Sequence, residues 1–413
     1  MVSRRTMLAA GAGITGGLVT AGCSTGSNAT WAEPGSAMPG SGSKTTSSPK
    51  SAVRVTVAPA ADAKAVSPAE PIVISAEGGT LQTVTVATSG GKTVAGALDS
   101  DQRTWRSSGT LEYSKTYTVT VAAVDTAGVT DQQTCTFETI KATGGTATVN
   151  FLANGFLALK NGQTYGVGQP IIVGFNKAVK DKAAAEKVMQ VSTVPSVEGR
   201  WRWIDSKTAH WRPAEYWAAG TKITVKVNAF GVNLGGDVYG ASNASVQFSI
   251  GQSRIAIADY NTHYMKCVFN GAVVKNIPVS MGKNATTTTP DGKTVYFATN
   301  SGVHVILNKE ATVRMSSASY GVTNSKDPNY YDETIKLACR ISNSGEYVHY
   351  ADWQMEAHGH ANISHGCINV GPVDAQWFFD NFQIGDVVQV TNSPRQLDLT
   401  NGLGDWNIPW AQW

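Results

Sequence analysis

Short runs in which apolar and polar residues alternate occupy most of the chain between residues 53 and 392. Residues 53–57, 81–86 and 117–121 are examples, and turn residues separate them. Such alternation indicates half-buried strands, because successive side chains of a strand point to opposite faces. Two stretches favour helices instead: residues 181–190, which begin with an acid and are rich in Ala, and residues 372–382, which begin with Pro. The pattern therefore predicts a mostly β protein.

One β unit occurs twice in the first part of the chain. The segment Pro71-Ile72-Val73-Ile74 is matched by Pro170-Ile171-Ile172-Val173, Trp105 by Trp211, and Phe137 by Phe248. The offset between the copies grows along the chain, so the second copy carries insertions. We predict tandem immunoglobulin-like β-sandwiches over residues 51–142 and 145–250. Aromatic residues of the second unit could form a sugar-binding platform, but we interpret them as core or interface residues: Trp201, Trp203, Trp211 and Trp217.

A third unit, residues 252–392, has strand patterns of its own. Asn270-Gly271 lies between two apolar runs, which is a strong signal for a tight hairpin. Further strands are predicted at residues 303–307, 338–341 and 386–390. The helix at 372–382 is predicted to place Val373, Trp377 and Asn381 on one face. This unit is thus predicted to be a β-rich domain with one main helix.

Composition excludes several classes of protein. The chain has 33 Lys and Arg against 30 Asp and Glu, a net charge of +3 that is not clustered, so we expect no nucleic-acid partner. Charged residues make up 15% of the chain, fewer than the roughly 25% of typical soluble domains. The 42% of hydrophobic residues is enough to build cores. Five Cys are too few for a disulfide scaffold. A β-rich extracellular protein fits these values.

The N-terminus predicts export. Ser3-Arg4-Arg5 precedes an apolar stretch over residues 7–22 that is too short to span a membrane. The paired arginines resemble a twin-arginine signal, and residues 19–23 resemble a bacterial lipobox in which Cys23 is lipidated. We therefore predict a signal peptide over residues 1–23 and a flexible linker over 24–50, with the protein anchored by lipid in the cell membrane and facing the cell wall or periplasm. A plain signal peptide with an incidental Cys23 is the alternative.

The candidate chemistry lies in one short window. Four of the seven histidines fall between residues 349 and 365, and a cysteine follows: His349, His358, His360, His365 and Cys367. An imidazole that takes the proton of a thiol makes the sulfur a nucleophile at neutral pH. A glycine before the cysteine, Gly366, lets backbone N–H groups approach a developing oxyanion. The window therefore predicts nucleophilic catalysis by a Cys–His pair.

This window resembles the catalytic domain of L,D-transpeptidases, whose signature is a His followed by Ser/Thr-His-Gly-Cys-x-Asn. Here the residues are His349 and Ser364-His365-Gly366-Cys367-Ile368-Asn369. The order of signal, two immunoglobulin-like domains, catalytic domain and Trp-rich tail is also similar to that of the mycobacterial enzymes. The resemblance covers residues 51–413. It implies that residues 393–413 form a short subdomain packed on the catalytic domain.

The resemblance also implies the roles of individual residues. Cys367 would be the nucleophile, His349 the base and later the acid, and His365 would shape the pocket. Backbone N–H groups of Gly366 and Cys367 would bind the oxyanion. Substrate contacts would come from the loop, the signature and a lid, in which Tyr330 would face the substrate: Ser344, Gly345, Asn369, Met315, Tyr320 and Tyr330. Relatives usually carry Ser directly after the catalytic His, where this chain has Tyr350; the backbone carbonyl of this residue would orient the imidazole.

The implied reaction joins two peptidoglycan stem peptides. Cys367 would attack the diaminopimelate carbonyl of a donor tetrapeptide, release D-Ala and form a thioester, which the diaminopimelate amine of an acceptor stem would resolve. Carbapenems would acylate the same sulfur. The resemblance implies no metal and no organic cofactor.

Three alternatives remain. His358, His360, His365 and Cys367 could bind zinc. The Cys–His pair could hydrolyse stem peptides as an L,D-carboxypeptidase. The chain could also be an inactive wall-binding lipoprotein. Separately, Cys267 and Cys339 could form a disulfide in an oxidising compartment, although buried free thiols are the default expectation.

Overall fold

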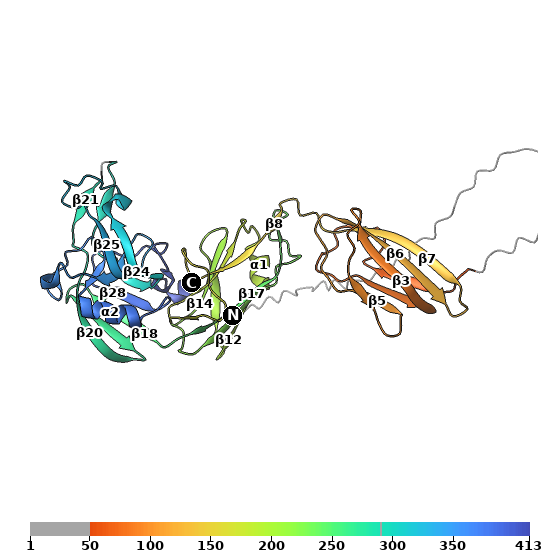
Figure 1. Ribbon diagram of the computed structural model, residues 1–413, viewed down its shortest axis with the longest axis horizontal. Coiled ribbons are helices and arrows are strands. Elements are labelled where there is room, and N and C mark those ends of the chain that lie inside the picture. The colour runs from red at the N-terminus through yellow and green to blue at the C-terminus, as the bar shows by residue number, and fades with distance from the viewer. Residues whose placement is uncertain (1–49, 290) are drawn as a thin grey trace, which may run out of the picture. The chain divides into compact units, whose positions relative to one another are not determined.

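The computed structural model describes residues 50–289 and 291–413. The predicted signal peptide, the lipidation site Cys23 and residues 24–49 of the predicted linker lie outside the described residues. The chain divides into two compact units between Thr143 and Gly144 (Figure 1). None of the helices in the described ranges is both long enough and apolar enough to cross a membrane.

The first unit consists of two antiparallel sheets whose inner faces form one core. One sheet has the order β1-β2-β5-β4 and the other β3-β6-β7. Alternate residues of β6 are buried, as the sequence pattern predicts. The strands are β1 (Arg54–Ala58), β2 (Val73–Glu77), β3 (Gly79–Thr88), β4 (Gly96–Leu98), β5 (Thr104–Ser107), β6 (Thr116–Asp125) and β7 (Thr130–Glu138).

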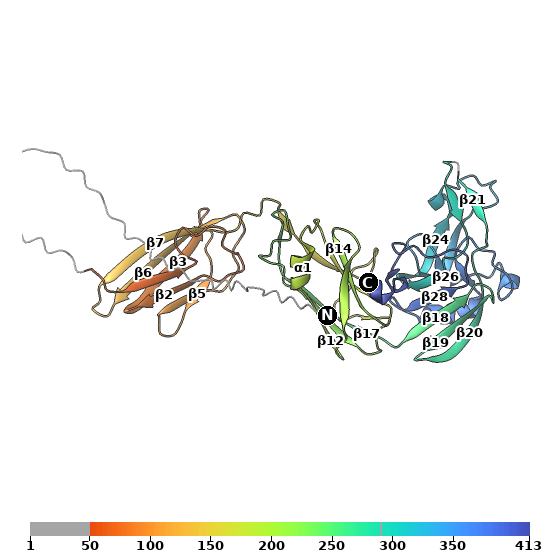
Figure 2. The same cartoon turned by 180° about the vertical axis from the view of Figure 1, so that it is seen from behind.

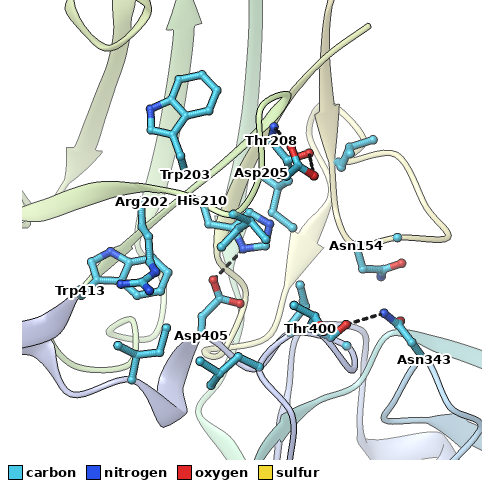
Figure 3. A pocket seen from close by; sticks show the side chains of 18 residues that line it. Asn154, Arg202, Trp203, Asp205, Thr208, His210, Asn343, Thr400, Asp405 and Trp413 are labelled. Carbon is cyan, nitrogen blue, oxygen red and sulfur yellow. Dashed lines mark hydrogen bonds and ion pairs between the residues drawn. The ribbon is translucent and has the colours of Figure 1, made fainter. Parts of the chain in front are cut away.

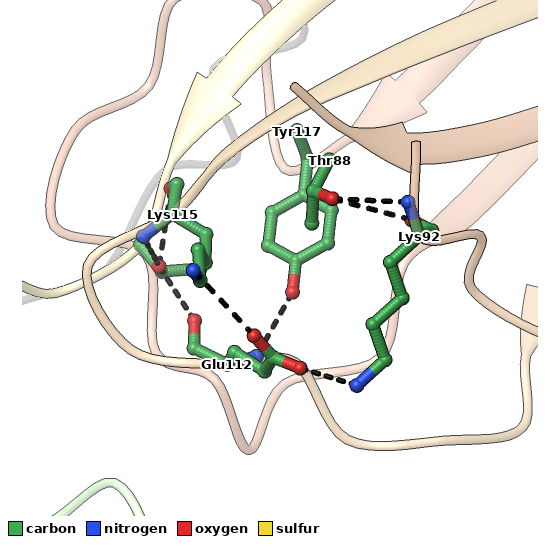
Figure 4. Close-up of polar contacts among 6 residues, drawn as sticks. Thr88, Lys92, Glu112, Lys115 and Tyr117 are labelled. Carbon is green, nitrogen blue, oxygen red and sulfur yellow. Dashed lines mark hydrogen bonds and ion pairs between the residues drawn. The ribbon is translucent and has the colours of Figure 1, made fainter. Parts of the chain in front are cut away.

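A tyrosine fastens the loop before β6 to this core (Figure 4). The hydroxyl of Tyr117 accepts a hydrogen bond from the Glu112 amide at 2.9 Å, while its ring stacks on Phe137 at 5.4 Å. The Glu112 carboxylate also pairs with Lys92 and Lys115. All three charged side chains are largely exposed, and such ion pairs contribute little to stability. The buried Tyr117 ring and its hydrogen bond therefore contribute most to holding this loop on the core.

The second unit begins with another pair of sheets. Their orders are β13-β14-β11-β9 and β10-β17-β15-β12, and β8 pairs with β16 beside them. The elements are β8 (Thr146–Ala147), β9 (Val149–Leu152), β10 (Thr164–Tyr165), β11 (Ile171–Phe175), α1 (Lys182–Val188), β12 (Met189–Val194), β13 (Gly199–Trp203), β14 (Thr208–Pro213), β15 (Lys222–Val227), β16 (Tyr239–Gly240) and β17 (Ala244–Ile250). Helix α1 starts where the sequence predicts, because the Asp181 carboxylate accepts the Ala184 amide, and it ends earlier because Met189 is extended.

The internal repeat is visible in how each sandwich holds its tryptophan. Trp105 of β5 packs against Gly96 on the neighbouring strand, and Trp211 of β14 packs against Gly199 in the same way. A Cβ on either glycine would lie 2.1 or 2.2 Å from the indole, so only glycine fits. Trp211 and Trp217 stack in the core at 5.5 Å. These two tryptophans are therefore core residues, as the sequence predicts.

One nine-stranded sheet organises the rest of the second unit (Figure 2). Its order is β23-β28-β18-β19-β20-β27-β26-β25-β24, and β21 and β22 form a separate hairpin. The strands are β18 (Arg254–Asp259), β19 (Tyr264–Phe269), β20 (Ala272–Ser280), β21 (Thr286–Thr288), β22 (Thr294–Tyr296), β23 (Gly302–Val305), β24 (Asn308–Ser316), β25 (Asp332–Arg340), β26 (Tyr347–Tyr350), β27 (Ile368–Val370) and β28 (Val387–Thr391). Asn270 and Gly271 both have positive φ between β19 and β20, so the predicted hairpin turn is confirmed.

Helix α2 (Pro372–Asn381) confirms the predicted main helix, with Pro372 in its first turn. The residues predicted to share one face do not form the buried one, because Val373 is 79% exposed and the buried residues are Ala375 and Phe378. Phe378 stacks on Phe382 with ring centroids 4.2 Å apart. Periodicity allowed more than one face, and the position of the sheet under the helix selects this one. Four short 3-10 helices complete the elements: η1 (Ser317–Tyr320), η2 (Met355–Ala357), η3 (Asp405–Asn407) and η4 (Trp410–Gln412).

The C-terminal tail, residues 393–413, contacts both parts of the second unit. Asn407 exchanges hydrogen bonds with the backbone of Val303 in β23. On the other side, the Arg212 guanidinium of β14 donates to the carbonyl of Ile408 at 2.6 Å. Three tail tryptophans surround this guanidinium at 4.4 to 5.5 Å: Trp406, Trp410 and Trp413. The tail thus joins the second sandwich to the nine-stranded sheet.

Candidate active site

The predicted catalytic pair is brought together by two adjacent parallel strands. His349 of β26 lies opposite Asn369 of β27 in the register. Cys367 directly precedes β27. The two predicted catalytic residues therefore come from neighbouring parallel segments, although a long connection separates them in the sequence.

Cys367 is held in a closely packed position. Its Sγ–H donates to the carbonyl of Gly345 at 3.7 Å. Burial raises the pKa of the thiol to about 12, although a hydrogen bond from the Tyr347 amide acts in the opposite direction. The nearby carboxylate of Glu346 also raises this pKa. The sulfur is therefore a thiol, not a thiolate, in the resting enzyme at neutral pH.

His349 is held as a neutral base. Its Nδ1–H donates to the backbone carbonyl of Tyr350 at 2.7 Å, which leaves Nε2 with the lone pair. The ring is 4% exposed, and burial lowers its pKa to about 4. Trp353 stacks on the ring at 6.1 Å. The Tyr350 side chain donates instead to Asp352, so replacing the usual Ser leaves the orienting carbonyl in place.

These two pKa values change the order of proton transfer expected from the sequence. A thiol with a pKa near 12 does not give its proton to an imidazole with a pKa near 4 before substrate binds. Both shifts come mainly from burial, which penalises each charged form. Both groups are therefore neutral at rest at neutral pH.

The turn before the nucleophile is fixed by two hydroxyl groups. Ser364 accepts the Gly366 amide at 3.1 Å and donates to the Cys367 carbonyl at 2.7 Å. Thr299 donates to the carbonyl of Gly366 at 2.8 Å. Gly366 has φ of +131°, a conformation that other residues rarely adopt. Because Ser364 occupies its amide in this structure, the oxyanion role of Gly366 stays a prediction.

The loop before β26 is braced from two sides. The amide of Ser344 donates to Asn401 of the tail at 2.7 Å, and Asn401 donates back to the Ser344 hydroxyl at 2.8 Å. The buried carboxylate of Glu346 accepts two hydrogen bonds from Asn300, at 2.7 and 2.9 Å. These contacts hold Gly345, whose carbonyl accepts the thiol. Sequence reasoning assigned no role to Glu346, Asn300 or Asn401.

Comparison with known proteins agrees with this site. A model of the L,D-transpeptidase catalytic domain matches residues 253–390, and a model of a bacterial Ig domain matches residues 63–233. L,D-transpeptidase 2 of Mycobacterium tuberculosis is 38% identical over 344 residues, which cover 83% of this chain and 79% of the relative. The chain belongs to the L,D-transpeptidase family. L,D-transpeptidases are acyltransferases.

Two further similarities were found. L,D-transpeptidase 5 of Mycobacterium tuberculosis is 32% identical to this L,D-transpeptidase over 370 residues, 88% of this chain and 77% of the relative. Among solved structures, an L,D-transpeptidase in complex with imipenem is 30% identical, with a TM-score of 0.48, over 59% of this chain and 99% of that one.

The lid of this L,D-transpeptidase contains a tyrosine that sequence reasoning missed. Tyr331 packs on His365 with centroids 5.3 Å apart, and its phenol is near enough to Cys367 for the two groups to interact electrostatically. Tyr320 packs beside it at 6.1 Å, and its hydroxyl donates to the carbonyl of Asn329. The predicted Tyr330 is 36% exposed, and its contact with substrate stays a prediction. The adjacent tyrosines 330 and 331 could not be told apart from sequence.

The remaining predicted residues differ in their surroundings. Met315 is half-buried near the end of β24, next to η1. His365 makes an edge contact with Phe297 at 4.9 Å. Asn369 is buried and donates to the side chain of Gln354 at 3.0 Å, so in this structure Gln354 occupies its amide. Gln354 was another residue without a sequence signal.

The zinc alternative finds no support in the geometry. Of its proposed ligands, His358 is buried whereas His360 is exposed, so these two side chains do not converge. In the described part of the chain, no group of three or more His, Cys, Asp or Glu side chains could hold a metal ion. Cys267 and Cys339 are unbridged, and burial raises the pKa of both thiols to about 12.

A cavity of about 400 Å³ lies away from the catalytic pair, between the second sandwich and the tail (Figure 3). In it His210 Nδ1 lies 2.6 Å from Asp405 Oδ1, and both side chains are buried. Asn343 donates to the carbonyl of Thr400 on the opposite wall. Neither Cys367 nor His349 lines this cavity. We assign it to the junction of the tail and the sandwich.

Proposed function

We propose that this L,D-transpeptidase forms direct diaminopimelate–diaminopimelate cross-links in peptidoglycan through a thioester on Cys367. The sulfur attacks the carbonyl of the third residue in a donor tetrapeptide while His349 accepts the thiol proton. The C–S bond forms, the C–N bond to D-Ala breaks, and His349 returns the proton to the leaving amine. The side-chain amine of diaminopimelate on an acceptor stem then displaces the sulfur, which regains a proton through His349.

One observation carries this proposal. His349 lies on the strand next to the one that Cys367 precedes, and its Nε2 is unprotonated because the Tyr350 carbonyl accepts a hydrogen bond from Nδ1–H. A neutral imidazole in this tautomer is the base that a buried thiol requires. An inactive wall-binding protein would not need this arrangement, so it argues against the third alternative.

The lid supports amine transfer over hydrolysis. Tyr320 and Tyr331 bring aromatic surface over His365 beside the nucleophile. A thioester under such cover is less accessible to water than an open one, while an acceptor amine enters with the rest of its stem. Hydrolysis by the same pair is the second candidate reaction. The ratio of cross-linked dimer to tripeptide after incubation of a tetrapeptide stem separates the two reactions.

Carbapenems are proposed as covalent inhibitors on chemical grounds. Their strained lactam carbonyl is a target for the same sulfur, and ring opening leaves an acyl-enzyme. The test is intact-protein mass spectrometry after carbapenem treatment, with Cys367→Ala and with Cys267→Ala as a matched control. We expect an adduct on the wild type and on Cys267→Ala only. An adduct on Cys367→Ala, or dimer formation by that variant, would contradict the assignment of the nucleophile.

We also propose that the enzyme is exported and anchored through lipid on Cys23. The N-terminal sequence supports this, as does the location of peptidoglycan outside the cytoplasm. Fractionation tests it, because Cys23→Ala should move the processed protein from the membrane to the soluble fraction. Retention of the variant in the membrane fraction would contradict the anchor.

A further inference from the structure

Lys283 places a positive charge beside His365 of the signature. Its Nζ lies 3.0 Å from the side-chain oxygen of Asn329 and 3.4 Å from His365 Nε2. It also lies 4.9 Å from the ring centroid of Phe297. The residue is half-buried, and burial lowers the pKa of its ammonium group. Its surroundings are therefore neutral and partly desolvated.

The segment that carries Lys283 runs alongside the nucleophile turn. The Lys283 amide donates to the carbonyl of Ser364 at 3.0 Å, and Gly282 forms a parallel bridge with the same residue. His365 separates the ammonium group from Tyr331, whose phenol interacts with Cys367. The imidazole ring of His365 therefore lies between the Lys283 ammonium group and Tyr331, the lid tyrosine that interacts with Cys367.

This ammonium group lacks the counter-charge that its surroundings would favour. Across the described residues, no carboxylate lies within ion-pair distance of Lys283, whereas Lys275 of β20 pairs with Asp374 at 2.8 Å. A partly desolvated cation without an anionic partner costs free energy. A negatively charged substrate group bound at this position would offset this free-energy cost. The Lys283 ammonium group is therefore a candidate for ligand recognition.

We propose that Lys283 binds the α-carboxylate of the terminal D-amino acid of the donor stem, the residue that leaves on acylation. This inference rests on the proposed function. In a donor peptide the α-carboxylate is separated from the scissile carbonyl by one amide nitrogen and one α-carbon, roughly 4 Å in total. Lys283 contacts His365, two residues before Cys367, so its charge lies beside the turn that carries the nucleophile. Lys283 then favours donor stems with a free C-terminal carboxylate. It affects the rate of Cys367 acylation and not the later attack by the acceptor amine, because the residue that it binds leaves on acylation.

The experiment compares two donors that differ only at the C-terminus. The kcat/KM for release of the terminal residue is measured with a tetrapeptide acid and with its C-terminal carboxamide. The variants are Lys283→Met, Lys283→Arg and the exposed Lys293→Met as a matched control. For the wild type we expect a preference for the acid of at least about tenfold, the value of one charge-assisted contact.

We expect Lys283→Met to lose about tenfold or more on the acid, to keep the wild-type rate on the carboxamide, and so to lose the preference. Lys283→Arg should retain most of the preference, and Lys293→Met all of it. An equal loss on both donors would show a structural role and overturn the proposal, as would a preference that survives in Lys283→Met.

The failure of the proposed function has a different signature. In that case the wild type itself would release no terminal residue from either donor, whatever Lys283 does. Labelling of Cys367 by iodoacetamide, a neutral reagent, checks that the thiol stays accessible in each variant. Lys283→Met labelled like the wild type would show that the pocket is intact and that only recognition of the anion has changed.

Discussion

Two buried histidines of the second unit are used in opposite ways. His210, in the cavity beneath the tail, has a carboxylate partner, Asp405, at 2.6 Å. His349, beside the nucleophile, has only a backbone carbonyl on one nitrogen. The Asp405 carboxylate is the hydrogen-bond partner of the His210 ring and so holds the tail against the second sandwich. The carbonyl sets the tautomer of the second ring and leaves its other nitrogen for chemistry.

The same contrast holds for the cations near each site. Arg212 is enclosed by three indole rings and donates to the carbonyls of Pro213 and Ile408. Lys283 is partly enclosed and has no anionic partner among the described residues. At the junction the protein itself supplies partners for His210 and Arg212, whereas we propose that Lys283 receives its anionic partner from the substrate. Substitutions at the junction and beside the catalytic pair test this difference.

The largest effect is expected from His349→Gln. Loss of the base should lower kcat for cross-linking by about a thousandfold, because general base catalysis contributes on the order of 10²–10⁴. Thermal or denaturant unfolding should change little, since one ring with a single hydrogen bond is replaced by a polar side chain of similar length. Steady-state kinetics and denaturant curves measure the two quantities. A variant that kept its turnover would remove His349 from the mechanism.

His210→Ala is expected to lower stability and to leave turnover nearly unchanged, the reverse of His349→Gln. The Asp405 carboxylate, 4% exposed, would lose its partner, and we expect a loss of about 1–3 kcal/mol in the free energy of unfolding. Turnover well below the unfolding midpoint should stay within a few fold of the wild type. Urea denaturation followed by tryptophan fluorescence measures this. Unchanged stability would show that the pair does not fasten the tail.

The smallest effect concerns the pH dependence of acylation. With a His349 pKa of about 4, the imidazole stays unprotonated down to that pH, so the rate should be nearly constant between pH 5.5 and pH 8. A histidine with an ordinary pKa of about 6.5 would lose roughly nine-tenths of the rate by pH 5.5. Stopped-flow acylation by a carbapenem gives the profile.

His358 sharpens this test. Burial is the largest cause of the lowered pKa of His349, and the charge of His358 lowers it further. Both ring nitrogens of His358 lack a hydrogen-bond partner in the described structure. His358→Gln should therefore move the acidic limb of the profile upward, by less than about one pH unit. His360→Gln, at an exposed position, should leave the profile unchanged. Identical shifts in both variants would rule out a specific effect of His358.

The sequence was a good guide where the signal is local. The Asn270-Gly271 turn, the start of α1 at Asp181 and the start of α2 at Pro372 follow from the preferences of the residues themselves. The His349 and Cys367 pair was predicted through the signature, and its role stays a prediction. The buried face of α2 had no such signal, since helical periodicity offers several faces and the sheet chooses one.

The supporting residues of the site had no local signal. Glu346, Asn300, Gln354 and Asn401 are ordinary polar residues, and each acquires its role only by contact with a distant segment. Tyr331 differs from Tyr330 by one position, and only the fold decides that Tyr331 packs on His365 while Tyr330 is exposed. The neutral state of the catalytic pair was also beyond the sequence, because it depends on how deeply the two groups are packed.

The sequence by itself determined the β character of the chain, its repeat and the candidate reacting groups, since these depend on residue type and spacing. The tertiary structure alone decided which polar groups are matched and which are left open. A pairing such as His210 with Asp405, or the lack of one at Lys283, is set by segments far apart in the chain. Burial then fixes the charge of each group, because the penalty for a charged form depends on everything packed around it.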